Sequence, residues 1–300
     1  MHNEASSAEV RNLRSENPSW TPDAGHGKRE GGNLRGVRRR FSNFDFRISP
    51  WAASLLALLV AVAALPPSAR GAQRVWEKSF EMPPGSHISV VNVHGSVLVE
   101  GWDRAEVEAT VAMRSDAPAD QLDDVQVAVE ARPSGLAFHT LYPAGLDTPI
   151  RVDYRLRVPR QVCLDELSTL QGDVVVHDVD GSLNARNLHG DIEALNFSGS
   201  LMAHALRGNI LVSFRELPDR RLPIRLAAIN GNVDLRLPPR ANANLVVSTV
   251  AGSIASDYPF QASSTPGDST RRAQLGTGGV LVELHTVRGN IRVGERDEDL

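Results

Sequence analysis

The sequence is poor in cysteine and in aromatic residues. Cys163 is the single cysteine, so an intramolecular disulfide framework is excluded. Aromatic residues make up 5 % of the chain, although 41 % of it is hydrophobic and 24 residues are glycine. This composition favours a β-rich protein with an aliphatic core, in which Cys163 is expected to be a small buried side chain.

The spacings that mark common catalytic and metal-binding sites are also missing. The chain has no C-x-x-C, H-E-x-x-H, H-x-H or G-x-S-x-G sequence, no P-loop and no dinucleotide-binding fingerprint. We therefore predict no catalytic residue, no metal ligand and no cofactor, and we interpret the protein as a non-enzyme.

An apolar run long enough to span a bilayer as a helix, roughly 20 residues, is absent. The run from Ala52 to Leu65 has fourteen residues, follows an arginine-rich stretch and is followed by small residues. This layout predicts a signal peptide over residues 48–71, with cleavage before Ala72. Retention of the run as an N-terminal membrane anchor is the alternative. Either interpretation implies export to the cell envelope, in the periplasm or at the surface.

The polar residues 1–47 have no hydrophobic periodicity and are predicted to be disordered. Their length ahead of a signal peptide is unusual. Either the true start lies later, near Val37, or the segment precedes a retained anchor.

Basic residues are in the minority beyond the signal region. Ten of the 32 Lys/Arg and six of the 36 Asp/Glu lie in residues 1–71, so the remaining chain has 22 basic and 30 acidic residues and a net charge of −8. Nucleic-acid affinity comes mainly from basic side chains that neutralise phosphates. This charge argues against nucleic acid and against an anionic lipid surface as partners.

Glycine, in contrast, recurs every nine residues through the middle of the chain. An apolar residue stands two positions before each of these glycines and another two positions after it. The regular copies are centred on Gly172, Gly181, Gly190, Gly199 and Gly208, and looser copies on Gly95, Gly231, Gly252 and Gly289. Apolar residues alternate with others between the glycines, which is the period of a β-strand. We interpret the glycines as structural turn positions that need positive φ or a close backbone approach.

The residue after each glycine indicates a longer period. Asp or Asn alternates there with Ser, so the full repeat is eighteen residues with two strands in each coil. Gly172, Gly190 and Gly208 are expected along one edge of the stack, and Gly181 and Gly199 along the other.

Stacked short repeats of this kind predict an all-β fold, a parallel β-solenoid or β-helix with an aliphatic interior. We place the solenoid repeats at residues 169–294 and a small β-sheet region before them at 72–168. Residues 256–279 are expected to form a long surface loop. The acidic tail, 295–300, is expected to protect the last coil from further strand pairing.

Two sets of polar residues are candidate sites. Asp173 and Asp191 occupy the same position in adjacent coils, as a carboxylate pair of a glycosidase would. Asx residues at glycine turns more often hydrogen-bond their own backbone, so we predict a turn-forming role for both. His177 and His204 share a repeat position but are one and a half coils apart, which places them on opposite sheets.

The repeats resemble those of the bacterial putative-adhesin family, whose domain has an uncharacterised function. The shared apolar-x-Gly-Asx/Ser-Ile/Val motif and its flanking features stand at Leu170–Val174, Ile229–Val233, Val250–Ile254, Val287–Ile291, Gly95–Asp103 and Tyr154–Pro159. The resemblance covers about residues 75–294. It implies a role in surface attachment, and it brings no catalytic or ligand-binding residues with it.

Together these features predict an exported, non-enzymatic adhesin-like or envelope scaffold protein. Its β-surface would bind an envelope protein or a surface polymer. A membrane-anchored periplasmic accessory or sensor module is one alternative, and a carbohydrate-active β-helix enzyme is another.

Overall fold

The eighteen-residue repeat folds into strands that alternate between two arms of one hydrogen-bonded sheet. The computed structural model describes residues 72–115, 122, 124–132, 134–143, 150–219, 222–261 and 269–296. The disorder expected for residues 1–47 and the signal peptide expected for 48–71 lie outside these residues, as does most of the acidic tail. The described residues contain no α-helix, and among them no helix is long and apolar enough to cross a membrane.

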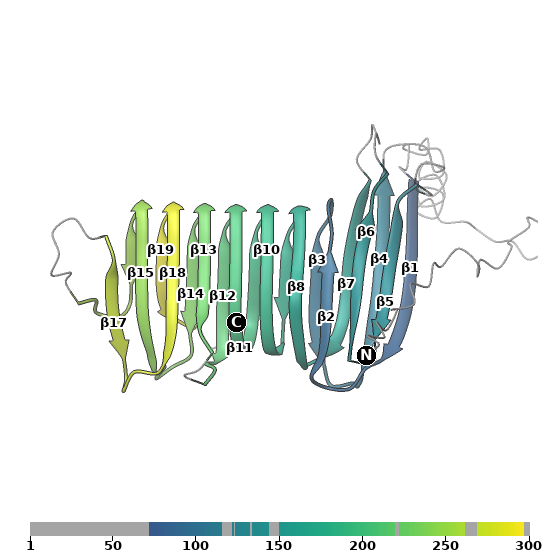
Figure 1. Cartoon of the computed structure of the whole chain (residues 1–300). Coiled ribbons are helices and arrows are strands. Elements are labelled where there is room, and N and C mark those ends of the chain that lie inside the picture. Colours follow the sequence, from purple (N-terminus) through teal and green to yellow (C-terminus); the bar gives the residue numbers. More distant parts are fainter. Residues whose placement is uncertain are drawn as a thin grey trace, which may run out of the picture. The chain divides into compact units, whose positions relative to one another are not determined.

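We name the arms sheet 1 and sheet 2. Sheet 1 consists, in spatial order, of β5 (Gln126–Arg132), β6 (Gly135–Leu141), β2 (Ser86–Val91), β8 (Gln161–Gln171), β10 (Asp180–His189), the second half of β11 (Ile192–Arg207), β13 (Ile224–Asn230), β18 (Val280–Arg288), β15 (Ala243–Ala251) and β17 (Arg271–Leu275). Figure 1 shows many of these strands side by side.

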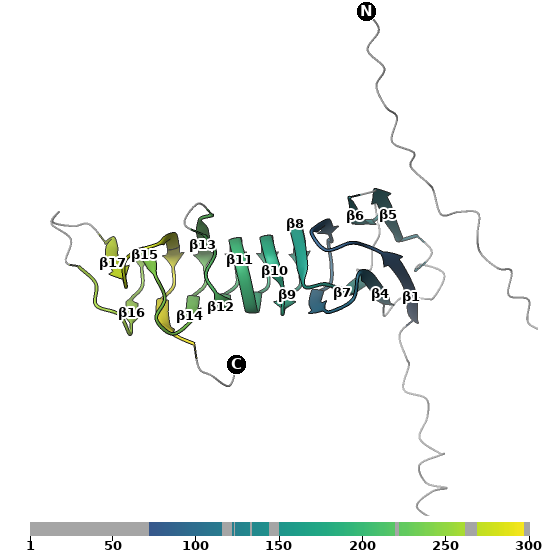
Figure 2. The ribbon, with the colours of Figure 1, turned by 90° about the horizontal axis from the view of Figure 1, so that it is seen from below.

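Sheet 2 faces sheet 1, and Figure 2 shows the two as opposite rows. It consists, in spatial order, of β1 (Ala72–Glu81), β4 (Glu106–Ser115), β7 (Arg151–Pro159), β3 (Val97–Trp102), β9 (Val174–His177), the first half of β11, β12 (Ile210–Glu216), β14 (Val233–Leu237), β19 (Ile291–Glu295) and β16 (Ile254–Ser256).

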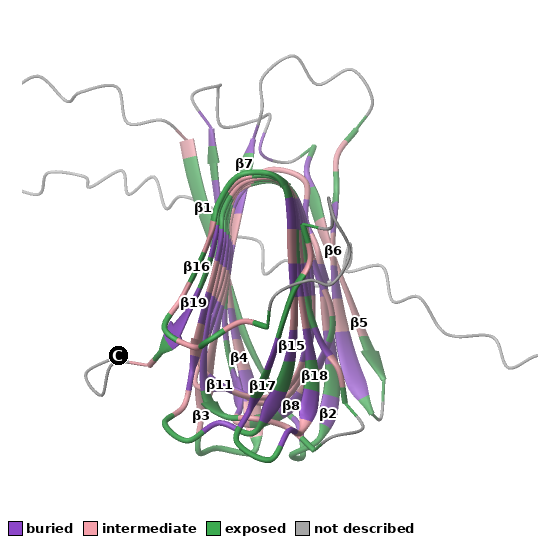
Figure 3. Cartoon of the chain, turned by 90° about the vertical axis from the view of Figure 1, so that its left-hand side faces the viewer, coloured by how far each residue is buried: buried purple, intermediate pink, exposed green. Residues whose placement is uncertain are grey.

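The predicted period of eighteen residues is confirmed by the strand register. Ile192 pairs with Val174 on one side and with Ile210 on the other, each eighteen residues away. These pairings are parallel, so the all-β parallel solenoid is confirmed as well. Figure 3 looks along the stack and shows the turns that join the two arms.

The interior between the arms is aliphatic because alternate residues of each strand point into it. The first residue after each turn on the sheet 2 side is fully or almost fully buried, at Val97, Val174, Ile192, Ile210, Val233 and Ile291. At the opposite edge, Phe197 and Phe214 stack edge-to-face, with ring centroids 5.9 Å apart.

The repeat glycines lie in two stacks, on the edges that the sequence predicts. Gly190 has φ 137°, and a Cβ atom on it would overlap the carbonyl of Gly172, one coil away. Gly199 meets Gly181 in the same way at the opposite edge. Glycine is therefore needed here because the neighbouring backbone fills the space that any side chain would take.

The stack does not follow the order of the chain. In space the glycines of the main edge run Gly95, Gly172, Gly190, Gly208, Gly231, Gly289, Gly252. The final copy in the sequence, β18 and β19, is therefore inserted between the copies centred on Gly231 and Gly252.

This order corrects two expectations. The coil that precedes the acidic tail is not at the end of the stack, because β19 already has β14 on one side and β16 on the other. Residues 256–279 are not only a loop, because they contain β17, which pairs antiparallel with the outer side of β15. The end of the core there is covered by Tyr258 and Phe260, which are partly buried against it.

At the other end, the sheets continue across the boundary expected between residues 168 and 169. Strands β2 and β3 form a coil that pairs directly with β8 and β9. Beyond them, β1 and β4 end sheet 2, and β5 ends sheet 1, through antiparallel pairing. Antiparallel edges prevent another coil from adding in register.

Candidate binding groove

A row of aliphatic side chains crosses the outer face of sheet 1, two residues before each main-edge glycine. This aliphatic row is Val93, Leu170, Leu188, Leu206, Ile229, Val287 and Val250, in spatial order. Three of its members are well exposed, Leu170 at 47 %, Ile229 at 45 % and Val250 at 72 %. The residues of this row therefore lie on the outer face and do not belong to the aliphatic interior.

The strand period explains the outward orientation. Leu167 and Thr169 in β8 are buried, so Ser168 and Leu170 between and after them face outward. The turn at Gly172 then returns the chain inward at Val174. Counting the alternation from Leu167 instead of from the glycine would have found this row in the sequence.

Six of the seven members of the aliphatic row, all but Val250, line an open groove of about 720 Å³. Its lining includes the row members from Val93 to Val287 and the outward residues two positions earlier, among them Ser168, Arg186, His204, Ala227 and His285.

The polar residues of the groove include one arginine and two histidines. Burial lowers the pKa of His204, and the nearby positive charge of Arg186 lowers it further. His285 makes a 2.9 Å hydrogen bond through Nδ1 with the hydroxyl of Ser248. Arg186 lies 3.7 Å from a Glu166 carboxylate oxygen, as an exposed ion pair.

The carboxylates of Asp173 and Asp191 do not line this groove. Each accepts a hydrogen bond from the backbone N–H one coil further on: Asp191 N donates to Asp173 Oδ1 at 2.9 Å, and Asn209 N to Asp191 Oδ1 at 2.6 Å. The expectation that these residues bond their own turn is therefore wrong, whereas their structural role is supported. We call this series of contacts the Asx ladder.

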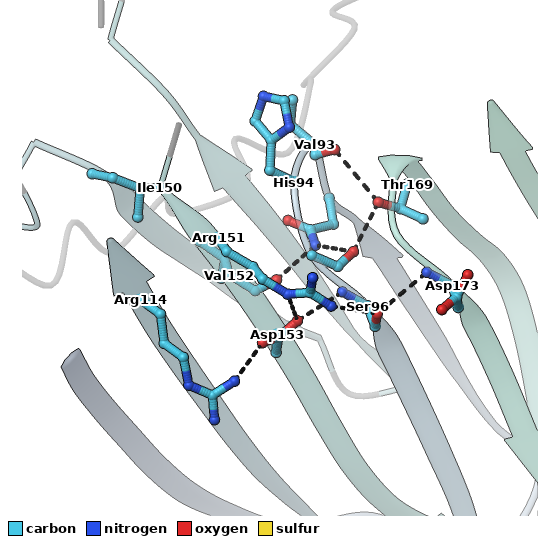
Figure 4. Close-up of polar contacts among 12 residues, drawn as sticks. Val93, His94, Ser96, Arg114, Ile150, Arg151, Val152, Asp153, Thr169 and Asp173 are labelled. Carbon is cyan, nitrogen blue, oxygen red and sulfur yellow. Dashed lines mark hydrogen bonds and ion pairs between the residues drawn. The ribbon is translucent and has the colours of Figure 1, made fainter. Parts of the chain in front are cut away.

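The Asx ladder extends through most of the stack. It continues through Asn232, Asn290 and Ser253, each of whose N–H groups donates to the previous member. At the other end, Ser96 N donates to Asp153 Oδ1 at 2.9 Å and Asp173 N to Ser96 Oγ at 3.3 Å, as Figure 4 shows. Arg114 and Arg151 pair with Asp153 and neutralise this end of the ladder.

A second set of side chains binds the glycine carbonyls from inside the stack. The donors stand three residues before a glycine, where Thr169 bonds Gly95 O, Asn187 bonds Gly172 O, Thr286 bonds Gly231 O and Thr249 bonds Gly289 O. The same position is alanine at 205 and 228, which leaves Gly190 and Gly208 without such a donor. Both alanines lie beneath the groove.

The histidines are distributed over both arms. His177 lies in β9 of sheet 2 and His204 in the part of β11 that belongs to sheet 1, so their separation onto opposite sheets is confirmed. His94 and His189 both neighbour Gln171, and His94 Nδ1 is 3.1 Å from Gln171 Oε1. In the part of the chain that the structure describes, no cluster of three or more His, Cys, Asp or Glu could hold a metal ion.

Cys163 and Trp102 lie outside the groove. Cys163 is a free thiol with intermediate exposure, so the expectation of a buried cysteine is wrong. Trp102 donates from Nε1 to Glu106 O at 2.9 Å and has the guanidinium groups of Arg104 and Arg157 over its ring, at 4.8 and 5.8 Å from the centroid. The indole N–H and ring of Trp102 are therefore already engaged by neighbouring residues.

Comparison with known families confirms the resemblance noted in the sequence. Residues 166–294, which run from β8 to β19, match the family model described as Toastrack DUF4097. No curated protein sequence matches the chain significantly.

Several solved structures resemble the chain at low identity. A "putative cell adhesion protein" from Clostridium sporogenes is 10 % identical over 74 % of this chain and 100 % of its own, with a TM-score of 0.39. A "putative adhesin" from Bacteroides fragilis is 11 % identical over 74 % of this chain and 97 % of its own, with a TM-score of 0.35. A "putative lipid binding protein" from Parabacteroides distasonis is 9 % identical over 76 % of this chain and 98 % of its own, with a TM-score of 0.26.

Proposed function

We propose that this protein is an exported, non-enzymatic, adhesin-like or scaffold protein of the cell envelope. It binds an envelope protein or a surface polymer through the outer face of sheet 1. The observation that carries the proposal is the aliphatic row, which places an exposed apolar surface inside a groove of about 720 Å³.

An apolar surface of this extent has a physical cost unless it is covered. The seven residues of the row lie on coils about 4.8 Å apart, which gives the row a length of roughly 29 Å. Large contiguous apolar patches on soluble proteins typically mark interaction sites. The strand edges are the other common binding surface of a β-protein, but three of the four edge strands, β1, β5 and β17, end the sheets with antiparallel pairing.

The scaffold suits a binding role because the groove is built on paired strands. Each rung is fixed by pairing to the coil on either side and by the Asx ladder. A site on rigid elements loses little conformational freedom when its partner binds.

Export rests on the run Ala52–Leu65 and is tested separately. The full chain with a C-terminal tag is expressed in bacteria, intact cells are treated with protease, and the mature N-terminus is measured by mass spectrometry. Digestion from outside, with a mature start at Ala72, supports a surface adhesin. Protection of the tag together with retention of residues 52–65 overturns the surface assignment and supports the anchored periplasmic module.

Binding is tested by the adherence of cells that display the full chain. We compare the native chain with the variant Leu188→Ser, Leu206→Ser, Ile229→Ser, at surface amounts matched through the tag. The control is Leu141→Ser, which replaces a residue that is 52 % exposed at the end of β6, outside the groove.

Increased adherence with the native chain and the control, but not with the triple variant, is the expected result. Equal adherence of all three, or no increase over cells without the protein, would overturn the proposal. Thermal melts of the purified variants check that each remains folded. We expect them to, because all four positions are exposed or half-buried.

A further inference from the structure

The residues that border the aliphatic row carry positive charge and no negative charge. One border lies two positions before each member of the aliphatic row. It consists of Val91, Ser168, Arg186, His204, Ala227, His285 and Ser248. The other border lies one position after each member. It consists of His94, Gln171, His189, Arg207, Asn230, Arg288 and Ala251.

On the strand side, the nearest carboxylates lie one row further out and are paired with arginines. Glu283 pairs with Arg225 at 2.5 Å, and Glu166 lies 3.7 Å from Arg186. At the glycine edge, Asp173 and Asp191 accept backbone N–H bonds in the Asx ladder. Arg207 and Arg288 are exposed beside the row. The groove therefore combines an aliphatic floor with cationic borders although the chain beyond residue 71 is acidic.

This combination excludes several occupants. A second copy of the chain, placed face to face on the same groove, would bring the arginines of both copies together. Proteins that bind single-stranded nucleic acid stack its bases on aromatic side chains, and the groove lining contains no Phe, Tyr or Trp. A planar membrane does not reach the floor of a concave site, and an open groove leaves much of a single acyl chain in water.

An amphipathic helix matches the aliphatic row in length and its borders in charge. A helix has a diameter of about 10 Å with its side chains and a pitch of about 5.4 Å, close to the rung spacing of about 4.8 Å. A length of roughly 29 Å corresponds to about 19 helical residues. One apolar helix face would contact the aliphatic row, and acidic residues beside that face would lie near the arginines.

We propose that the groove of sheet 1 binds an amphipathic helix of a partner protein, whose apolar face is flanked by Asp and Glu. The helix lies across the strands, along the aliphatic row. This inference rests on the proposed function and specifies the class of partner.

The proposal is tested with two synthetic peptides of about 20 residues, a length that matches the row. Both have leucines at helical spacing along one face, which is flanked by glutamates in one peptide and by lysines in the other. Binding to the full chain is measured by fluorescence anisotropy at low and moderate salt.

The protein is used in four forms. These are the native chain, the triple serine variant described above, the charge-reversed variant Arg186→Glu, Arg207→Glu, Arg288→Glu, and the control Arg292→Glu, which changes an exposed arginine of sheet 2.

The native chain and the Arg292→Glu control are expected to bind the glutamate peptide at least about tenfold more tightly than the lysine peptide. The charge-reversed variant inverts this preference, and the triple serine variant loses affinity for both. Equal binding of the two peptides, or no binding of the glutamate peptide, overturns the proposal. Groove-dependent binding to vesicles of phosphatidylglycerol, without peptide binding, overturns it in favour of lipid.

The outcomes separate this inference from the proposed function. If adherence depends on the aliphatic row but the glutamate peptide neither binds nor blocks adherence, the helix proposal fails and the binding function stands. If the peptide binds as expected but adherence is unchanged by the triple serine variant, the adhesin-like function fails.

Discussion

The backbone N–H of Asp191 donates a 2.9 Å hydrogen bond to Oδ1 of Asp173, the equivalent residue of the preceding coil. The Asp173 carboxylate, whose sequence position made it a candidate for a catalytic pair, therefore serves as an acceptor between coils. Asp191 in turn accepts from both N–H and Nδ2 of Asn209, at 2.6 and 3.3 Å. The repeat position requires an acceptor oxygen, and both Asp and Asn supply one.

The ladder predicts different effects for two replacements of Asp191. Asp191→Asn retains the acceptor and removes one of two neighbouring negative charges, so the free energy of unfolding should stay within about 0.5 kcal/mol of the native value. Asp191→Ala removes the acceptor for Asn209 and should lower it by about 0.5–1.5 kcal/mol. Urea unfolding measures both. Equal destabilisation by Asn and Ala would show that the charge, and not the acceptor, is what matters.

Filling the missing positions of the inner hydrogen-bond series should stabilise the stack. Ala205→Thr and Ala228→Thr place a hydroxyl where Thr169, Thr286 and Thr249 already donate to a glycine carbonyl in other coils. Each is expected to raise the free energy of unfolding by about 0.5–1.5 kcal/mol. The control Ala203→Thr adds the same group at a buried position without a glycine carbonyl and should destabilise by about 1–3 kcal/mol. Destabilisation by all three would mean that the coils leave no room at these positions.

The inward and outward faces of one coil can be compared directly. Ile192 is 1 % exposed, so Ile192→Asp leaves an unpaired charge in the core at a cost of several kcal/mol and should unfold the protein. Leu188→Asp, four residues earlier on the outer face, should change stability by less than about 0.5 kcal/mol. Circular dichroism melts of the two variants test the assignment, which fails if Ile192→Asp is tolerated or Leu188→Asp unfolds the chain.

A buried tyrosine predicts loss of stability at high pH. Burial raises the pKa of Tyr154 to about 12, and its hydroxyl lies 2.6 Å from Thr140 Oγ1. Thr140 donates its own proton to Asn92 Oδ1, so the Tyr154 hydroxyl must be the donor to Thr140 and must stay protonated.

The sign of the pH effect follows from the raised pKa. The unfolded chain loses this proton near pH 10, whereas the folded chain retains it to about pH 12, so the stability is complete below pH 10 and is lost as the pH rises through that window. The loss is about 1.4 kcal/mol per pH unit for one group. Tyr154→Phe should flatten the decline in urea unfolding between pH 10 and 12; part of it remains because burial also raises the pKa of Tyr142. An unchanged slope would assign the alkaline transition to other groups.

The sequence was sufficient for the local rules of the repeat. The glycine spacing gave the period, the two turn edges and the parallel register, because each is determined by residues within one or two coils. The separation of His177 and His204 followed from the same count. The aliphatic row did not follow from the motif, because the motif places an apolar residue on each side of the glycine. The residue before the turn faces outward, whereas the residue after the turn is buried.

The order of the coils could not be read from the sequence. Nothing in the copy centred on Gly289 distinguishes it from the copy centred on Gly252, yet it lies further inside the stack. Its place depends on β17, which pairs with the outer side of β15 and sends the chain back to the inner side for β18. Such pairings join residues far apart in the chain, and equivalent repeats offer equivalent partners for them.

Local sequence therefore determined what each coil is: its length, its turns and its aliphatic interior, since steric limits at glycine and the two-residue strand period act on neighbouring residues. The tertiary structure alone decided what the coils form together. Stacking aligned the outward leucines, isoleucine and valines into one row and placed Arg186, Arg207 and Arg288 along its borders. A surface of this kind exists only when separate coils are placed side by side, which is why no single repeat reveals it.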